Sequence, residues 1–161
     1  FLNVGRHDER QKKLTRIIYA AEQLKKDNKK FRIIFIGDGP DTNLYKEEVK
    51  NKKLEHEIVF LGRKKNPYPY YKLCDCVVLS SDYEGYPVVY LESFILDKPI
   101  ITTNVSDSEQ IEGQGIVVEK DETEIYKAMK DFIENGYQIT KQFDAKDYNN
   151  SIFNKLQEII G

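Results

Sequence analysis

The chain has 161 residues, of which 40% are hydrophobic and 32% are charged, a balance that is ordinary for one globular domain with its own core. Its formal net charge of −2 argues against a general nucleic-acid-binding protein, which would carry an excess of basic residues. Apolar runs reach only strand length, so we expect no membrane span, and the apolar context of Cys74 and Cys76 indicates small core residues in a reducing, cytoplasmic compartment.

Segments of strand type and helix type alternate along the chain. Apolar runs predict strands over residues 1–5, 31–36, 57–61, 77–79, 98–103 and 115–118. Helical spacing predicts helices over residues 12–28, 41–53, 66–73, 123–135 and 144–160, with another that begins at Pro87. This alternation predicts an α/β fold built on a doubly wound parallel sheet of about six strands.

The predicted helices each have one apolar face. Leu44 and Val49 are expected to face the core from the helix over residues 41–53, and Gly136 is expected to cap the end of the helix over residues 123–135.

The sequence Gly-Asp-Gly-Pro at 37–40 follows the second strand and invites comparison with the dinucleotide fingerprint. Gly37 and Gly39 occupy the first two glycine positions, but Thr42 stands at the third and Pro40 interrupts the turn. We therefore expect no NAD site there. A tight turn and a loop that faces another ligand remain as alternatives.

The most informative stretch is 80–96, where a strand leads through a polar turn into an amphipathic helix. Gly85 permits a close approach of the backbone to a ligand, and Pro87 suits the first position of a helix. Glu84 and Glu92 bracket the helix start. A helix start after a parallel strand presents free N–H groups, so this turn predicts a site for an anionic ligand.

The run Glu84-Gly85-Tyr86-Pro87, followed by Leu91-Glu92-Ser93, resembles the Glu-x7-Glu motif of the group 1 (family 4) retaining glycosyltransferases. Members of that family have two Rossmann-like domains, the GT-B fold, and bind a nucleotide-sugar with the C-terminal half. The resemblance extends over nearly the whole chain. It implies that residues 1–161 are a single nucleotide-sugar-binding domain, a fragment that lacks the N-terminal acceptor domain.

The resemblance also implies which residues contact the donor diphosphate. In the family, an Arg and a Lys after the first strand do so, and they match Arg6 and Lys12 here, with Lys13 as the alternative to Lys12. An Arg fork suits phosphate oxygens, and a Lys adds a point charge. Val88 and Val89, at the helix start, would add backbone N–H groups.

The remaining family positions concern the donor sugar, the ribose and the base. Glu84, the candidate catalytic residue, is expected beside the donor sugar as nucleophile, charge stabiliser or acceptor of sugar hydroxyl groups. Glu92 would accept hydrogen bonds from the ribose hydroxyls. Gly85 and Tyr86 are expected at the sugar and ribose, and Gly62 and Arg63 near the base.

A metal site and a cofactor are not expected. No Asp-x-Asp pair stands in a suitable loop, and Asp82 is isolated, so cations and N–H dipoles would stabilise the leaving diphosphate. Related sequences carry a Gly-rich turn ahead of a Glu between the fifth and sixth strands. Here Glu109 is retained without the glycines.

The resemblance implies transfer of a hexose or similar sugar, with retention, to a glycan or lipid-linked acceptor in surface polysaccharide biosynthesis. UDP-sugar is expected ahead of GDP-sugar, and the missing domain would bind the acceptor and provide any peripheral attachment to the inner face of the plasma membrane. The alternatives are half of a nucleotide-sugar epimerase, a phosphorylase-like enzyme, and a non-catalytic binding module. For an epimerase, His7 and His56 are poorly placed as acid/base groups, and no pyridoxal-bearing Lys is evident for a phosphorylase.

Overall fold

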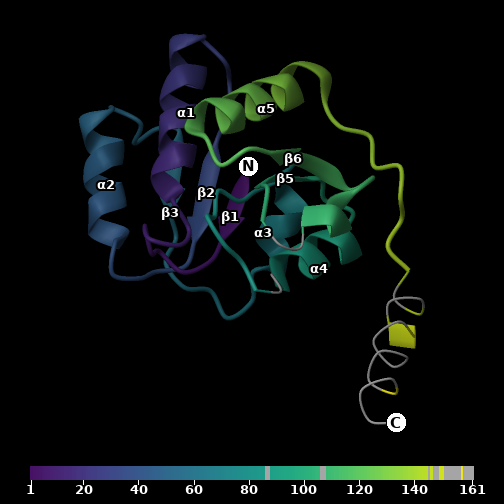
Figure 1. Ribbon diagram of the computed structural model, residues 1–161. Coiled ribbons are helices and arrows are strands. Elements are labelled where there is room, and N and C mark those ends of the chain that lie inside the picture. Colours follow the sequence, from purple (N-terminus) through teal and green to yellow (C-terminus); the bar gives the residue numbers. More distant parts are fainter. Residues whose placement is uncertain (86–87, 106–107, 145, 147–148, 151–156, 158–161) are drawn as a thin grey trace.

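The computed structural model describes residues 1–85, 88–105, 108–144, 146, 149–150 and 157 (Figure 1). Tyr86 and Pro87 of the motif turn lie outside the described residues, as does most of the helix expected over residues 144–160. Within the described ranges, no helix is long and apolar enough to cross a membrane.

The strands form one parallel sheet in the order β3-β2-β1-β4-β5-β6. This arrangement confirms the predicted α/β fold class. The strands are β1 (Leu2–Val4), β2 (Ile33–Ile36), β3 (Ile58–Phe60), β4 (Val77–Val78), β5 (Ile100–Thr103) and β6 (Gly115–Val118).

Helices cover both faces of the sheet (Figure 1). On one face, α1, α2 and α5 pack over one apolar core, and on the other, α3 and α4 pack over a second. The bounds are α1 (Leu14–Lys26), α2 (Thr42–Asn51), α3 (Tyr68–Leu73), α4 (Val88–Ile95) and α5 (Glu122–Asn135), with a short 3₁₀ helix, η1 (Ser108–Ile111).

The strands supply both cores because successive side chains point to opposite faces. In β2, Ile33 and Phe35 pack on the α1 side, whereas Ile36 packs on the α4 side. In β5, Ile101 packs on the α1 side and Ile100 on the α4 side. Burial on both faces explains why these strands read as continuous apolar runs in the sequence.

The strand order reverses between β1 and β4, and the two strands pair only briefly. Leu2 opposes Val77, and one position further the side-chain amide of Asn3 donates to the carbonyl of Val78 at 2.8 Å. After β1 the chain continues to α1 on one face of the sheet, and after β4 it continues to α4 on the other face. In open parallel sheets, ligands bind in the crevice at such a switch point.

Two local predictions were wrong. The first helix begins at Leu14 and not at residue 12, because Lys13 takes a left-handed conformation with φ 50°. In α2, Leu44 is exposed, and the inward side chains are Tyr45 and Val49, which lie four positions apart on one helix face. The predicted cap is confirmed, since Gly136 ends α5 with φ 71°.

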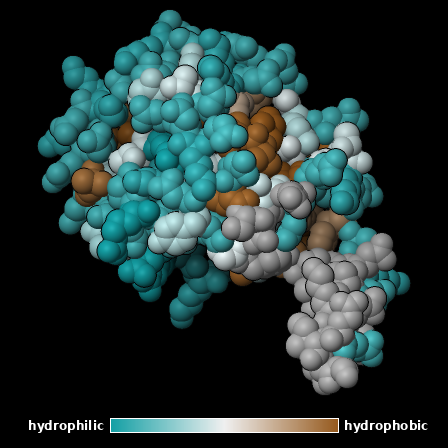
Figure 2. Space-filling view, in the orientation of Figure 1, coloured by the Kyte–Doolittle hydropathy of each residue, from teal (hydrophilic) through white to brown (hydrophobic). Residues whose placement is uncertain are grey.

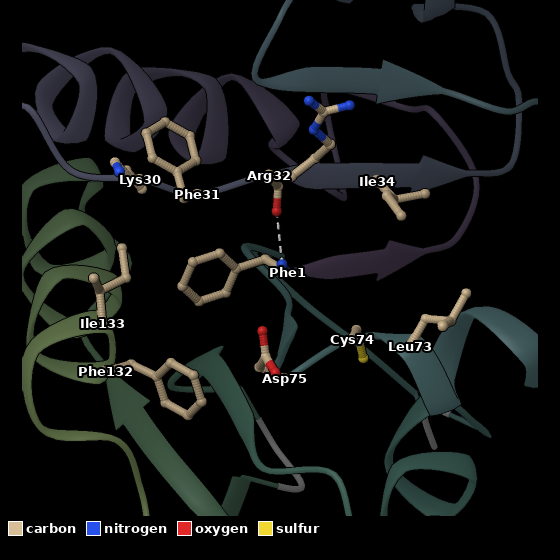
Figure 3. Close-up of a pocket in the computed structure, with 10 residues that line it drawn as sticks. All are labelled: Phe1, Lys30, Phe31, Arg32, Ile34, Leu73, Cys74, Asp75, Phe132 and Ile133. Atoms are coloured by element: carbon tan, nitrogen blue, oxygen red, sulfur yellow. Dashed lines mark hydrogen bonds between the residues drawn. The ribbon is translucent and has the colours of Figure 1, made fainter.

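The surface shows no extended apolar area on the face drawn in Figure 2, which is mainly hydrophilic with small separate hydrophobic areas. A hollow of about 550 Å³ opens at the amino ends of the strands, lined by residues that include Phe1, Phe31, Arg32 and Asp75 (Figure 3). It lies at the edge of the sheet opposite to the switch-point crevice. Its position therefore does not match the usual ligand site of this fold.

Candidate functional site

Two loops meet at the carboxyl edge of the sheet, one after β1 and one after β4. The ammonium of Lys12 donates to both carboxylate oxygens of Glu84, at 2.7 and 2.8 Å. The Glu84 side chain is only 6% exposed and that of Lys12 is 20% exposed. Two predicted site residues, 72 positions apart in the chain, thus form a largely buried ion pair at the switch point.

The carboxylate of Glu84 is held by a second donor. The hydroxyl of Ser81 donates to Glu84 Oε1 at 2.5 Å, and the Ser81 carbonyl accepts a hydrogen bond from the Thr103 hydroxyl at the end of β5. Glu84 is therefore positioned by groups from its own loop, from the β1 loop and, indirectly, from β5. Sequence reasoning did not find Ser81.

Ser80 anchors the backbone on the other side of the crevice. Its buried hydroxyl lies 2.8 Å from the carbonyl of Lys12 and 2.9 Å from that of Lys13. Lys13 turns its own ammonium toward Asp82, at 3.8 Å. Of the two lysines, the structure thus brings Lys12, and not Lys13, to Glu84.

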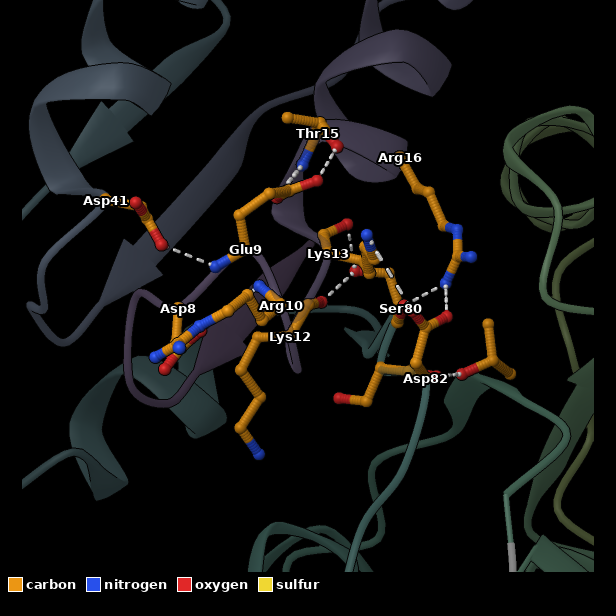
Figure 4. A network of polar contacts seen from close by, with 12 residues as sticks. Asp8, Glu9, Arg10, Lys12, Lys13, Thr15, Arg16, Asp41, Ser80 and Asp82 are labelled. Carbon is orange, nitrogen blue, oxygen red and sulfur yellow. Dashed lines mark hydrogen bonds and ion pairs between the residues drawn. The ribbon is translucent and has the colours of Figure 1, made fainter.

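Asp82, isolated in the sequence, is an ion-pair partner in the fold (Figure 4). Arg16 Nη1 lies 2.6 Å from Asp82 Oδ1 and also donates to the Ser80 carbonyl at 2.9 Å. Sequence reasoning did not identify Arg16, because its partners Ser80 and Asp82 lie 64 and 66 positions away in the chain. Among the described residues, no group of three possible metal ligands gathers.

The loop after β1 is tied down from both sides as well (Figure 4). The backbone N–H of Glu9 donates to Asp41 at 2.7 Å, and the Glu9 carboxylate accepts a hydrogen bond from the Thr15 hydroxyl. Arg6 is exposed in this loop, and within the described part of the chain it forms no ion pair. Asp8, in the same loop, pairs with Arg10 at 3.5 Å.

Glu92 projects from the second turn of α4 toward α3. Its Oε2 accepts a hydrogen bond of 2.7 Å from the hydroxyl of Tyr71, a side chain with no exposed surface. Burial, and then the adjacent Glu92 carboxylate, raise the pKa of Tyr71, so its hydroxyl stays a donor throughout the neutral range. Sequence reasoning did not find this contact between Tyr71 and Glu92.

The loop at 37–40 is a tight turn that is pressed against the β1 loop. Gly37 has φ 138°, and a Cβ there would lie 1.8 Å from the carbonyl oxygen of Gly5. A Cβ on Gly39 would lie 2.3 Å from the carbonyl oxygen of His7. Both glycines are thus required by backbone packing.

A pocket of about 390 Å³ adjoins this turn, at the carboxyl ends of β2 and β3. Its lining includes Asp38, Thr42 and Arg63, and the Arg63 guanidinium bonds to Asp38. Gly62, with φ 67° and open space around its α-carbon, makes the turn that leads to Arg63. Of the two residues expected near a base, Arg63 therefore lines a pocket at the carboxyl edge of the sheet, and Gly62 is its neighbour in the chain.

His7 is a core residue. Its Nδ1 lies 2.9 Å from the Thr42 hydroxyl, its Nε2 has no partner in the described ranges, and the rings of Phe35, Tyr45 and Phe60 surround it. Burial lowers the pKa of His7. Neither His7 nor the exposed His56 reaches the crevice as an acid/base group.

The rest of the motif turn is only partly described. Gly85 is exposed, and a Cβ there would meet nothing within 4 Å. Val88, which is exposed, and the half-buried Val89 form the start of α4. Tyr86 and the side chain of Glu109 lie outside the described residues.

The chain is similar to known proteins over most of its length. The family model described as glycosyl transferases group 1 matches residues 1–135. The N-acetylgalactosamine-N,N'-diacetylbacillosaminyl-diphospho-undecaprenol 4-alpha-N-acetylgalactosaminyltransferase of Campylobacter jejuni is 29% identical over 139 residues, which are 83% of this chain and 37% of that protein. The chain spans well under half the length of the first curated relatives that it matches.

The fold is also similar to that of solved glycosyltransferase structures. The C-terminal domain of a group 1 family glycosyl transferase (LpcC) from Francisella tularensis has a TM-score of 0.71 and 26% identity, over 83% of this chain and 75% of that one. Anabaena HepE in complex with UDP has a TM-score of 0.79 and 18% identity, over 98% of this chain and 48% of that one. The second likeness is one of fold.

Proposed function

Because this chain belongs to the group 1 glycosyl transferases and is similar to their C-terminal domain, we propose that it binds a nucleotide-sugar donor in the crevice between β1 and β4. The ion pair between Lys12 and Glu84 carries the proposal. It brings a cation suited to a diphosphate and a carboxylate suited to a sugar to the one place in this topology where ligands bind.

The diphosphate would lie against the loop after β1 and the start of α4. Lys12 supplies a positive charge inside the crevice, and Arg6, exposed on the same loop, supplies a fork for phosphate oxygens. The first amides of α4, at Val88 and Val89, supply N–H dipoles. Together these groups would stabilise the charge that develops on the leaving diphosphate without a metal ion or other cofactor.

With the diphosphate placed there, the sugar, the ribose and the base of the nucleotide-sugar can be assigned to neighbouring residues. Glu84 would face the sugar, with Gly85 leaving room for it, and Glu92 would accept hydrogen bonds from the ribose hydroxyls. The base would occupy the pocket beside Gly62 and Arg63. UDP-sugar is the proposed donor class, supported by the structural neighbour that is described in complex with UDP.

The reaction proposed for the whole protein is transfer of a hexose or similar sugar, with retention, to a glycan or lipid-linked acceptor that another domain binds. The name of the Campylobacter relative, a transferase acting on a diphospho-undecaprenol-linked sugar, supports a lipid-linked acceptor and a role in surface polysaccharide biosynthesis. The motif turn at Glu84 would face that second domain across the cleft.

Calorimetric titration of the 161-residue chain with UDP and with GDP, in buffer containing EDTA, tests the donor site. We expect UDP to bind more tightly than GDP and Arg6→Ala to weaken UDP binding by about tenfold, the value of one charge-assisted phosphate contact. Arg10→Ala is the matched control, because Arg10 lies in the same loop but pairs with Asp8, and it should leave the affinity unchanged.

Three results would count against the proposal in different ways. If the folded chain binds neither nucleotide, it is not a donor-binding domain. Binding that appears only when magnesium replaces EDTA would overturn metal independence. Equal losses in Arg6→Ala and Arg10→Ala would reduce the role of Arg6 to general charge.

A further inference from the structure

Tyr71 is the residue in contact with the proposed donor site that carries no role so far. It belongs to α3, on the face of the sheet that α4 also covers, and its ring is fully buried in the core with Tyr90 and Phe94. Only its hydroxyl reaches a polar partner, Glu92 Oε2 at 2.7 Å. A side chain packed on all sides has a fixed position, so the hydroxyl group with which Tyr71 hydrogen-bonds to Glu92 is fixed as well.

Glu92 gains a defined orientation from this contact. A glutamate on a helix surface has several rotamers of similar energy, and ordering them costs conformational entropy. The Tyr71 hydroxyl holds Oε2, whereas within the described ranges Oε1 accepts no hydrogen bond. A carboxylate only accepts hydrogen bonds, so the free oxygen is ready for a ligand that donates them, such as a diol.

We propose that Tyr71 is a positioning residue for ribose recognition, which acts through Glu92 and gives the site its preference for ribonucleotides over 2′-deoxyribonucleotides. The inference rests on the proposed donor site. Tyr71 holds one oxygen of Glu92, and the other accepts a hydrogen bond from the ribose 2′-hydroxyl. Preorganisation of this kind strengthens binding by removing the cost of ordering the acceptor when the ligand arrives.

A purely structural role for Tyr71 predicts a different effect of its removal on ligand affinities. If the Tyr71 hydroxyl only needed a hydrogen-bond partner because it is buried, its removal would affect the packing of α3 against α4. The affinity for every ligand would then fall equally. If it orients Glu92 for the 2′-hydroxyl, its removal should weaken only those ligands that carry this group. A pair of nucleotides that differ in that one hydroxyl separates the two roles.

The experiment measures the dissociation constants of UDP and 2′-deoxy-UDP for the wild-type chain, Tyr71→Phe, Glu92→Gln and the double variant. The wild type should prefer UDP by about tenfold, the usual value of one hydrogen bond to a charged acceptor. Tyr71→Phe should lose most of that preference through weaker UDP binding, with 2′-deoxy-UDP unchanged. The double variant should match Glu92→Gln, because both changes remove the same interaction.

Tyr68→Phe is the matched control, since Tyr68 lies on the same helix with a half-exposed ring and should keep the full preference. Thermal unfolding of each variant verifies that it is folded. Equal weakening of both ligands by Tyr71→Phe, or an unchanged preference, would overturn the inference while leaving the donor site intact. A folded wild-type chain that binds neither ligand would overturn the proposed function and this inference with it.

Discussion

At the scale of single residues, the Lys12–Glu84 ion pair links the stability of the fold to the proposed function. Both charges lie mostly out of water, so each is favourable only because the other is close. A bound diphosphate would offer Lys12 a second anionic partner and would compete with Glu84 for it. In the proposed function, the pair would therefore hold the positive charge of Lys12 in place until a nucleotide-sugar binds.

We expect Glu84→Gln to lower the free energy of unfolding by about 1–3 kcal/mol, because Lys12 loses the anion that compensates its charge. The same variant should bind UDP, which carries no sugar, several-fold more tightly, since the diphosphate no longer competes with a carboxylate. Urea unfolding and calorimetric titration measure the two effects. Glu55→Gln, an exposed site, should change neither quantity. Weaker UDP binding in Glu84→Gln would refute the competition.

At the scale of elements, the site depends on how closely the loops after β1 and β2 pack. Gly37 and Gly39 touch the backbone of Gly5 and His7, and the N–H of His7 donates to the Asp38 carbonyl at 2.9 Å. This contact places the start of the loop that carries Lys12. Gly85 differs, because the space around its α-carbon is open.

The two kinds of glycine should respond differently to alanine. Gly37→Ala puts a Cβ onto a carbonyl oxygen at a positive φ, so we expect a loss of about 3 kcal/mol or more in the free energy of unfolding. Gly85→Ala should stay within about 1 kcal/mol of the wild type, yet weaken nucleotide-sugar binding, since the methyl group enters space left for the ligand. Chemical unfolding and titration with UDP-glucose distinguish them. If Gly85→Ala leaves UDP-glucose affinity unchanged, this residue does not border the sugar.

At the scale of the whole molecule, a neutral imidazole lies within the core that supports the crevice. Burial is the main cause that lowers the pKa of His7, with Lys46 adding to it and Asp38 opposing it. The unfolded chain binds a proton on this ring near pH 6.5, whereas the folded protein resists protonation until lower pH. Between these values the unfolded state holds more protons, so stability falls as the pH drops.

Urea unfolding at pH 7.5 and at pH 5.5 measures this dependence. We expect the wild type and His56→Gln to be less stable at the lower pH, because both keep His7. His7→Gln has no group there that titrates in this window, so its stability should change less between the two pH values, whatever its absolute stability. An equal pH dependence in His7→Gln and His56→Gln would show that other groups cause it.

Much of the architecture could be predicted from local pattern. Strands buried on both faces read as apolar runs, and helices with one buried face repeat every three to four residues, so six strands and their helices were placed close to their observed bounds. The predictions for Leu44 and for the start of α1 were wrong. The adjacent Tyr45 faces the core instead of Leu44, and Lys13 has a left-handed backbone conformation that lies outside the helical region. The local pattern does not contain either fact.

The sequence alone thus determined the fold class, the family resemblance and the separate candidates Arg6, Lys12, Glu84 and Glu92, since each depends on residue type and spacing within a short segment. Tertiary structure alone decided that Lys12 contacts Glu84, that Arg16 pairs with Asp82, and that Tyr71 holds Glu92. The physical reason is that these contacts join loops and helices that are separated in the chain and come together only in the folded sheet and the helices packed on it. Side chains more than 20 positions apart along the chain become neighbours there through the packing of the whole sheet.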